Sequence, residues 1–162
     1  MQVWPVLQSL YLLTLANGSP VIAKKLFGNR LALPLDAGVL FLDGRPLLGR
    51  SKTVRGVLIS VAATATLAPL LGVDIATGAL VAAFAMLGDL LSSFTKRRLG
   101  LVSSAQAIGL DQIPESLLPL LACRDALSLT YADIAVCTGI FLVGELALSR
   151  VLYALHVRDQ PY

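Results

Sequence analysis

Long apolar runs without a charged side chain are the feature that most limits what this sequence can fold into. One run extends from residue 1 to residue 23, and another extends from residue 56 to residue 73. About 20 apolar residues suffice for a helix to cross a hydrocarbon core roughly 30 Å thick. Only 14% of the 162 residues are charged, whereas soluble domains carry about 25%. We therefore expect a membrane protein and not a soluble domain.

The apolar runs predict an all-α integral membrane protein with about five transmembrane helices and two functional cytoplasmic loops, in a single domain of residues 1–162. The predicted spans are residues 3–22, 56–73, 74–94, 113–129 and 131–155. Asn17, Gly18, Ser19 and Pro20 interrupt the inner end of the first span. This interruption predicts either a simple helix end or an Asn17 side chain that faces a site. The fourth span has the shortest apolar run, which Pro114 and Pro119 interrupt.

Basic side chains are concentrated in two of the predicted loops. Seven of the 13 Lys and Arg residues lie between Lys24 and Arg55, and three more are Lys96, Arg97 and Arg98. Five spans place both loops on one side of the membrane, and the positive-inside rule assigns that side to the cytoplasm. We expect an inner (cytoplasmic) membrane protein with its active-site loops facing the cytoplasm, and no nucleic-acid partner.

Asp89 is an acid inside a predicted span, where a charge needs a specific reason. On a helix, Asp89, Ser93 and Lys96 would share one face. A carboxylate that faces a water-filled site is a candidate Mg²⁺ ligand, and Lys96 and Arg97 could hold phosphates around that ion. The alternative is an inward-facing aspartate paired with a lysine or arginine, beside an ordinary basic flank.

The first basic loop contains a second cluster of polar residues. Gly44 allows a tight turn beside Asp43, and Lys52, Thr53 and Arg55 place two cations and a hydroxyl within four residues. Such a combination can cradle a triphosphate, although the Walker A pattern is absent. A basic loop that touches anionic lipids is the alternative.

Further acids follow the second basic loop. Asp111 and Glu115 are four residues apart and could join Asp89 around one metal ion or a metal pair. The alternative is that they favour the dipole at a helix N-terminus. Glu145 lies inside the fifth span and is either functional or paired with a structural partner. The two cysteines, Cys123 and Cys137, lack metal-ligand spacing, so we expect both in the core.

In this order, the motifs resemble the CDP-archaeol synthase family, which is related to phosphatidate cytidylyltransferases. The resemblance is carried by three stretches, which are Asp36 to Gly56, Gly88 to Arg98, and Asp111-Gln112. One departure concerns the family's D-Q-x-D pattern, because Pro114 occupies the second acidic position and Glu115 follows it.

The resemblance implies a cytidylyltransferase that uses CTP to convert a membrane lipid phosphate, archaeol-phosphate-like or phosphatidate-like, to a CDP-lipid and pyrophosphate. Its partners would be CTP, the lipid phosphate and the bilayer, and its cofactor Mg²⁺. Our hypothesis assigns the metal to Asp89, Asp111 and Glu115. It assigns the CTP phosphates and the lipid headgroup to Lys52, Arg55, Lys96 and Arg97. The residues on the nucleotide-binding side would be Asn17, Asp43, Gly44, Thr53 and Ser93.

Two other functions fit the sequence less well. A CDP-alcohol phosphotransferase would need a signature that begins D-G-x-x-A-R, and the sequence after Asp43-Gly44 lacks it. A non-enzymatic membrane scaffold or transport-related protein would need no nucleotide site. Transport requires acids along a path across the membrane, whereas Asp89, Asp111 and Glu115 are expected at one side.

Overall fold

The computed structural model describes residues 2–103 and 105–156, and over these residues every regular element is helical. The elements in chain order are α1 (Val3–Phe27), α2 (Val54–Leu67), the short 3₁₀ helix η1 (Ala68–Leu71), α3 (Ile75–Arg98), α4 (Gln112–Ala122) and α5 (Tyr131–Ala154). The predicted all-α membrane fold is confirmed.

Four helical stretches are long and apolar enough to cross a membrane, namely α1, α2 continued by η1, α3 and α5. The fourth helix differs from the prediction. Of the predicted span at 113–129, only the first part is helical, because α4 has 11 residues and extends about 16 Å at roughly 1.5 Å per residue. The chain then turns, and Leu127 and Leu129 of this turn are buried in the core. The rest of the predicted span therefore consists of turns and not of helix.

The predicted interruption of the first span is wrong, since α1 continues through Pro20 to Phe27. A proline lacks the N–H that would bond the carbonyl four residues earlier, which here is Ala16. Ser60 of α2 supplies the missing donor, because its Oγ lies 2.7 Å from the Ala16 oxygen. A neighbouring helix therefore compensates for the lost hydrogen bond, as membrane helices require.

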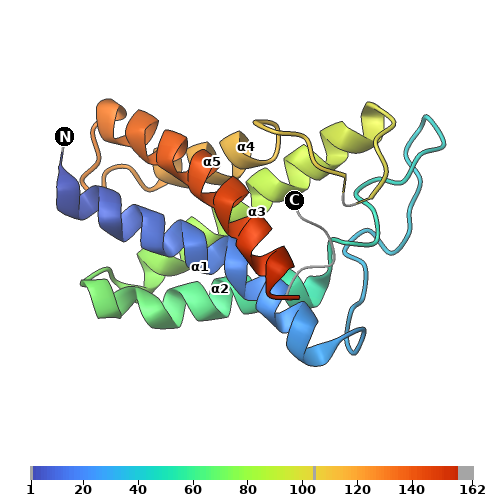
Figure 1. The fold of residues 1–162 in the computed structure, drawn as a ribbon, viewed down its shortest axis with the longest axis horizontal. Helices are drawn as coiled ribbons and strands as arrows, with labels where there is room; N and C mark the ends of the chain where they lie inside the picture. The colour runs from blue at the N-terminus through green and yellow to red at the C-terminus, as the bar shows by residue number, and fades with distance from the viewer. Residues whose placement is uncertain (1, 104, 157–162) are drawn as a thin grey trace.

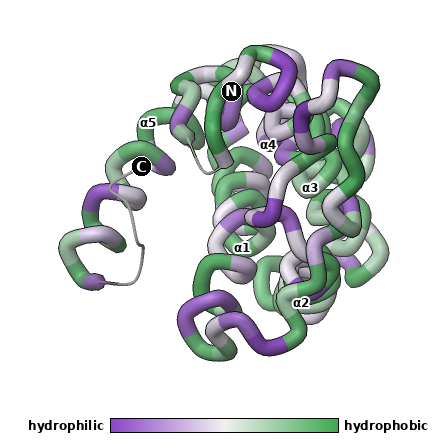
Figure 2. The backbone as a smooth tube through the Cα atoms, turned by 90° about the vertical axis from the view of Figure 1, so that its right-hand side faces the viewer, coloured by the Kyte–Doolittle hydropathy of each residue, from purple (hydrophilic) through white to green (hydrophobic). Residues whose placement is uncertain are grey.

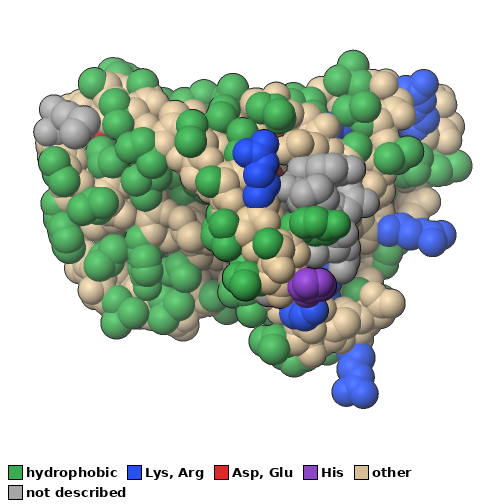
Figure 3. Space-filling model, in the orientation of Figure 1, with side chains coloured by type: hydrophobic (Ala, Val, Ile, Leu, Met, Phe, Trp, Pro, Cys, Tyr) green, Lys and Arg blue, Asp and Glu red, His purple; other side chains and the backbone are tan. Residues whose placement is uncertain are grey.

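The helices run alternately between two ends of the molecule (Figure 1). The loops at 28–53 and 99–111 lie at one end, and the short connections between α2 and α3 and between α4 and α5 lie at the other. The start of α1 meets the start of α5 there, where Gln2 N donates to Asp133 Oδ1 at 2.9 Å. In the face shown in Figure 3, the basic side chains lie mostly toward the loop end.

Two groups of buried apolar residues hold the bundle together. The larger group joins α1, α3, α4 and α5 through side chains that include Leu12, Val81, Leu120 and Phe141. The smaller one consists of Ala16, Ala82 and Ala85. Such small side chains let α1 and α3 approach closely, as is common where membrane helices pack. Green apolar segments extend along all the long helices (Figure 2). Cys123 and Cys137 are buried, as expected, and neither is in a disulfide.

Candidate active site

An ion pair joins the first basic loop to the C-terminal half of α3. Lys52 Nζ lies 2.6 Å from Asp89 Oδ1 and 2.5 Å from Asp89 Oδ2. The two side chains are 20% and 21% exposed, so the pair is accessible from outside the protein. Lys52 immediately precedes Thr53, the N-cap of α2, and this position directs it toward α3. The predicted convergence of Lys52 and Asp89 on one side of the bundle is confirmed.

The carboxyl group of Glu115 lies beside that of Asp89, within hydrogen-bonding reach. Glu115 is 6% exposed. Two acids and a lysine therefore form a compact cluster, which we call the acid–lysine cluster (Lys52, Asp89 and Glu115). Burial by itself would lower the pKa of Lys52, but the charges of Asp89 and Glu115 outweigh burial and raise it. Lys52 thus remains a cation.

Gly88 makes the approach of the two acids possible. A Cβ at Gly88 would lie 2.2 Å from the carbonyl oxygen of Pro114 and 2.7 Å from the nitrogen of Glu115. The N-terminal turn of α4 therefore packs directly against the backbone of α3, next to Asp89. Sequence reasoning assigned Gly88 no such role, although a glycine that precedes an acid within a span was a signal for close packing.

A second ion pair connects the end of α3 to the second loop. Lys96 Nζ lies 2.6 Å from Asp111 Oδ1 and donates to the Ala105 oxygen at 3.0 Å. Asp111 Oδ2 accepts a hydrogen bond from Ala107 N at 3.0 Å. Ser92, which the sequence prediction omitted, donates to the Leu110 oxygen at 2.7 Å. These contacts hold residues 105–111 against α3 and place the start of α4.

Asp36 organises the first loop, a role that the sequence did not reveal. Its carboxylate accepts hydrogen bonds from three backbone N–H groups, those of Gly38, Leu48 and Gly49, at 3.1, 2.9 and 3.0 Å. Burial by itself would raise the pKa of Asp36, but these hydrogen bonds outweigh burial and lower it. Gly49 has φ of 98°, a conformation that favours glycine. Asp36 therefore closes the turn that precedes Lys52.

Arg98 and Arg45 connect the tip of the first loop to α3. Arg98 Nη1 lies 2.5 Å from Asp43 Oδ1, and its guanidinium stacks over the rings of Phe41 and Phe94 at 4.7 and 5.0 Å from their centroids. Arg45 Nη1 donates to the carbonyl of Arg98 at 2.6 Å, where the helix dipole favours a cation. Asp43, predicted to shape the nucleotide end, therefore lies in an ion pair at the loop tip.

Three other predicted residues have structural contacts of their own. Arg55 donates to the carbonyl oxygens of Gly28, at 3.0 Å, and Arg30, which holds the start of the loop. Thr53 Oγ1 accepts from Gly56 N at 3.1 Å as the N-cap of α2. Arg97 Nη2 donates to the Val102 oxygen at 2.7 Å.

The remaining predicted residues lie at different depths. Ser93 is buried on α3, at 3% exposure. Gly44 has φ of 72° at the turn of the loop tip. Asn17 donates to the Leu13 oxygen of its own helix at 3.1 Å and lines a groove between α1 and α5.

The side chains available as ligands determine how a metal ion would fit. Among the residues that the structure describes, no three His, Cys, Asp or Glu side chains come close enough to hold a metal ion. The predicted grouping of Asp89, Asp111 and Glu115 is therefore not formed, because Asp111 pairs with Lys96 at the start of α4. Mg²⁺ commonly takes one or two carboxylates together with substrate phosphates. Asp89 and Glu115 fit that pattern.

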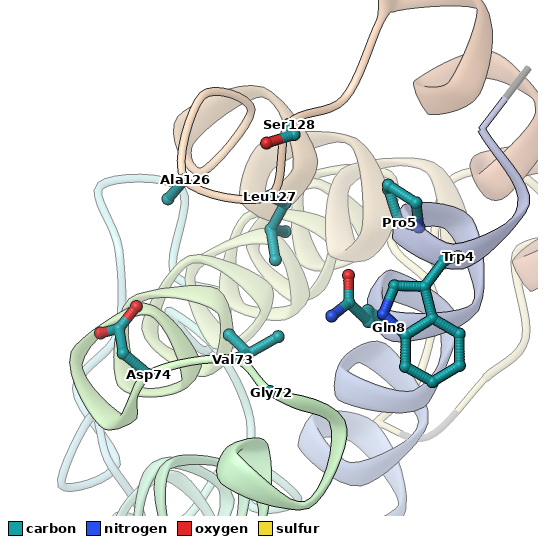
Figure 4. Close-up of a pocket in the computed structure, with 9 residues that line it drawn as sticks. All are labelled: Trp4, Pro5, Gln8, Gly72, Val73, Asp74, Ala126, Leu127 and Ser128. Atoms are coloured by element: carbon teal, nitrogen blue, oxygen red, sulfur yellow. The ribbon is translucent and has the colours of Figure 1, made fainter.

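A separate cavity of about 300 Å³ lies at the other end of the bundle. Figure 4 shows Gln8, Val73 and Leu127 pointing into it, with Trp4 and Asp74 at its edge. It contains none of the predicted site residues, and the helices separate it from the acid–lysine cluster. The cluster, and not this cavity, is the candidate active site.

Comparisons with known proteins agree on one family. The model described as "CarS-like: CDP-archaeol synthase" matches residues 68–162. A CDP-archaeol synthase of Sulfurisphaera tokodaii is 36% identical over 153 residues, which covers 91% of this chain and 89% of the relative. One from Hyperthermus butylicus is 40% identical over 137 residues, covering 75% of this chain and 77% of the relative.

A solved structure is similar to the fold as well. It is described as "Structural insight into an intramembrane enzyme for archaeal membrane lipids biosynthesis" and superposes with a TM-score of 0.69 at 32% identity, covering 85% of this chain and 90% of that chain.

Proposed function

Because the chain belongs to the CDP-archaeol synthase family, we propose that it is a cytidylyltransferase that uses CTP to convert a membrane lipid phosphate to a CDP-lipid and pyrophosphate. The lipid phosphate would be archaeol-phosphate-like or phosphatidate-like. The observation that carries the proposal is the acid–lysine cluster, in which Lys52 lies 2.6 and 2.5 Å from the carboxylate oxygens of Asp89. The whole chain, residues 1–162, acts as one membrane-embedded domain.

In this reaction an oxygen of the lipid phosphate attacks the α-phosphorus of CTP, and the bond to the β-phosphate oxygen breaks to release pyrophosphate. The chemistry depends on position and charge neutralisation more than on a covalent intermediate. Lys52 is a permanent cation that can bind phosphate oxygens, and Lys96 and Arg97 are further cations on the adjacent face of α3. Asp89 and Glu115 would hold Mg²⁺, which when bound neutralises phosphate charge.

The remaining predicted residues support the site indirectly. Arg55 and Asp43 would act by holding the start and the tip of the first loop, respectively. Asp111 would place the second loop through Lys96. Thr53 would set the start of α2, and with it the position of Lys52. Gly44 turns the loop tip, Ser93 is buried on α3, and Asn17 lines the groove between α1 and α5.

The orientation follows from charge. Both basic loops lie at the same end of the bundle (Figure 1), so we assign that end to the cytoplasmic face of the inner membrane. CTP is a cytoplasmic metabolite in any cell, and the lipid phosphate is delivered by the bilayer itself. The acid–lysine cluster, at the inner ends of membrane-crossing helices, is accessible to both.

A purified-enzyme assay tests this function. The full chain would be incubated with labelled CTP, Mg²⁺ and lipid phosphates with isoprenoid or acyl chains, and pyrophosphate and CDP-lipid would be measured. We expect Asp89→Asn to lower turnover by at least about 100-fold, because a group that holds charge at the reaction centre is lost. Asp125→Asn is the control, because Asp125 is exposed in the turn at the opposite end.

The outcomes are distinct. No product with any lipid phosphate would exclude the enzyme and favour a scaffold. Product formation with undiminished turnover in Asp89→Asn would retain the enzyme and exclude the site.

Metal removal gives a second test. Chelation should abolish product formation, and added Mg²⁺ should restore it, because two carboxylates and phosphate oxygens form a hard-oxygen donor set. Glu115→Gln should raise the Mg²⁺ concentration needed for half-maximal activity by roughly tenfold. Equal metal requirements in wild type and Glu115→Gln would remove Glu115 from the metal site.

A further inference from the structure

A groove of about 230 Å³ runs between α1 and α5, lined from both helices by residues that include Gly18, Phe141, Gly144 and Glu145. Both helices are candidate membrane spans, so the groove lies at membrane depth. We propose that it binds a hydrocarbon chain of the lipid-phosphate substrate beside the reaction centre. This inference rests on the proposed function and identifies the part of the protein that recognises the chain.

The walls of the groove suit an apolar occupant. Its polar side chains on α1 already use their donors within the helix, since Thr14 Oγ1 donates to the Leu10 oxygen at 2.7 Å and Asn17 Nδ2 to the Leu13 oxygen at 3.1 Å. Each of these hydrogen bonds satisfies a donor inside the helix, which lowers the free-energy cost of placing a hydrocarbon beside the side chain. The other lining groups include Ile140 and Leu148, so most of the contact surface is apolar.

Two glycines keep the groove open. Gly18 on α1 and Gly144 on α5 both line it, and a Cβ built at either position would meet no heavy atom within 4 Å. A hydrocarbon chain can therefore lie against bare backbone on both walls. The volume equals about eight water-sized groups at roughly 30 Å³ each, so the groove accommodates only a segment of a long chain, and the remainder extends into the bilayer.

One residue of the groove interacts electrostatically with the candidate active site. Glu145 lines the groove, and its carboxyl group is close enough to that of Glu115 to interact with it electrostatically. Glu115 in turn lies beside Asp89 in the acid–lysine cluster. A lipid whose chain occupies the groove would place its phosphate near the cations and carboxylates of the cluster. A bulk lipid on another helix face would not have its phosphate held near the acid–lysine cluster.

Filling the groove tests the inference. Gly144→Leu places a branched side chain in it from α5, and Gly18→Leu does so from α1. Gly139→Leu is the matched control, because Gly139 is an exposed residue of α5 that also has open space around it and does not line the groove. Thermal unfolding in detergent verifies that each variant is folded. If Gly144→Leu does not fold, Gly144→Ala is a milder variant that can replace it.

We expect the two groove variants to raise KM for a long-chain lipid phosphate by about tenfold. Each methylene displaced from the groove lowers the binding affinity roughly fourfold. KM for CTP should stay unchanged. Wild type and Gly139→Leu should favour long chains over short ones, and Gly144→Leu should show less of this preference.

Equal lipid KM values in Gly144→Leu, Gly18→Leu and Gly139→Leu would overturn the inference, since the groove would then hold bulk lipid only. Inactivity of the wild-type enzyme on every lipid phosphate would instead overturn the proposed function.

Discussion

Single charged side chains in this protein mostly hold loops in place around the acid–lysine cluster. Asp36 is the clearest case, because one carboxylate accepts hydrogen bonds from three backbone N–H groups, those of Gly38, Leu48 and Gly49. These three donors lie outside the acid–lysine cluster, yet Asp36 shapes the turn from which Lys52 extends to Asp89. Hydrogen bonds to a charged acceptor are stronger than those to a neutral one.

Replacement of Asp36 by asparagine should therefore destabilise the loop by roughly 1–3 kcal/mol. The pKa of Asp36 is lowered from 3.8, so its contribution is complete above that value and is lost as the pH falls through the lower pKa of the folded state. Thermal unfolding in detergent at pH 7 should separate wild type from Asp36→Asn, and the difference should shrink as the pH falls below 3.8. A difference that persists unchanged in acid would show that the charge does not matter.

At the scale of elements, the contact between α3 and α4 brings the two acids together. Gly88 leaves room for the carbonyl of Pro114, which a Cβ would approach to 2.2 Å. A rigid backbone contact of this kind cannot be relieved by a side-chain rotation. The separation between the two helices, and hence between Asp89 and Glu115, depends on this one residue.

Gly88→Ala should force α4 away from α3 and cost roughly 1–3 kcal/mol of stability, the usual range for overpacking. Turnover of CTP should fall further than the loss of folded protein explains, because Glu115 moves away from Asp89. Gly139→Ala is the control, since nothing lies within 4 Å of its added Cβ. Unfolding and turnover measured on the same preparations distinguish the two effects, and full activity in folded Gly88→Ala would contradict this account.

At the scale of the whole molecule, the two loops form one surface at one end of the bundle. Arg98 and Arg45 join the first loop to the end of α3, and Lys96 joins the second loop to the same helix. All of these cations lie at the end opposite to the turn that contains Asp125. Under the proposed function, this asymmetry would determine where the nucleotide binds and how the protein is oriented in the membrane.

Cysteine labelling in intact cells or sealed vesicles tests that orientation. A cysteine at Arg50, which is exposed in the first loop, should react with a membrane-impermeant maleimide only after the membrane is opened. A cysteine at Asp125, exposed in the turn between α4 and α5, should react before opening. Cys123 and Cys137 are buried and would be replaced first. Labelling in the reverse order would place the acid–lysine cluster on the outer face.

Much of this fold could be predicted from the sequence, because a bilayer tolerates few arrangements of backbone. Long apolar stretches predicted α1, α2 with η1, α3 and α5, although α3 contains Asp89 and α5 contains Glu145. The position of the basic residues predicted that both loops lie at one end. The predicted helix bounds were wrong where a residue elsewhere in the fold compensated for a local helix-breaking pattern. Pro20 looks like a helix end until Ser60 of α2 bonds the carbonyl of Ala16.

The order of residues was enough to predict that acids and cations would gather at one end of the apolar helices, since charges in a membrane need partners there. Which of these residues meet depends on how the helices pack. Lys52 pairs with Asp89 and Lys96 with Asp111, and the close approach at Gly88 makes Glu115 the second acid beside Asp89. Pairing of this kind depends on distances between helices, and no pattern along a single chain contains them.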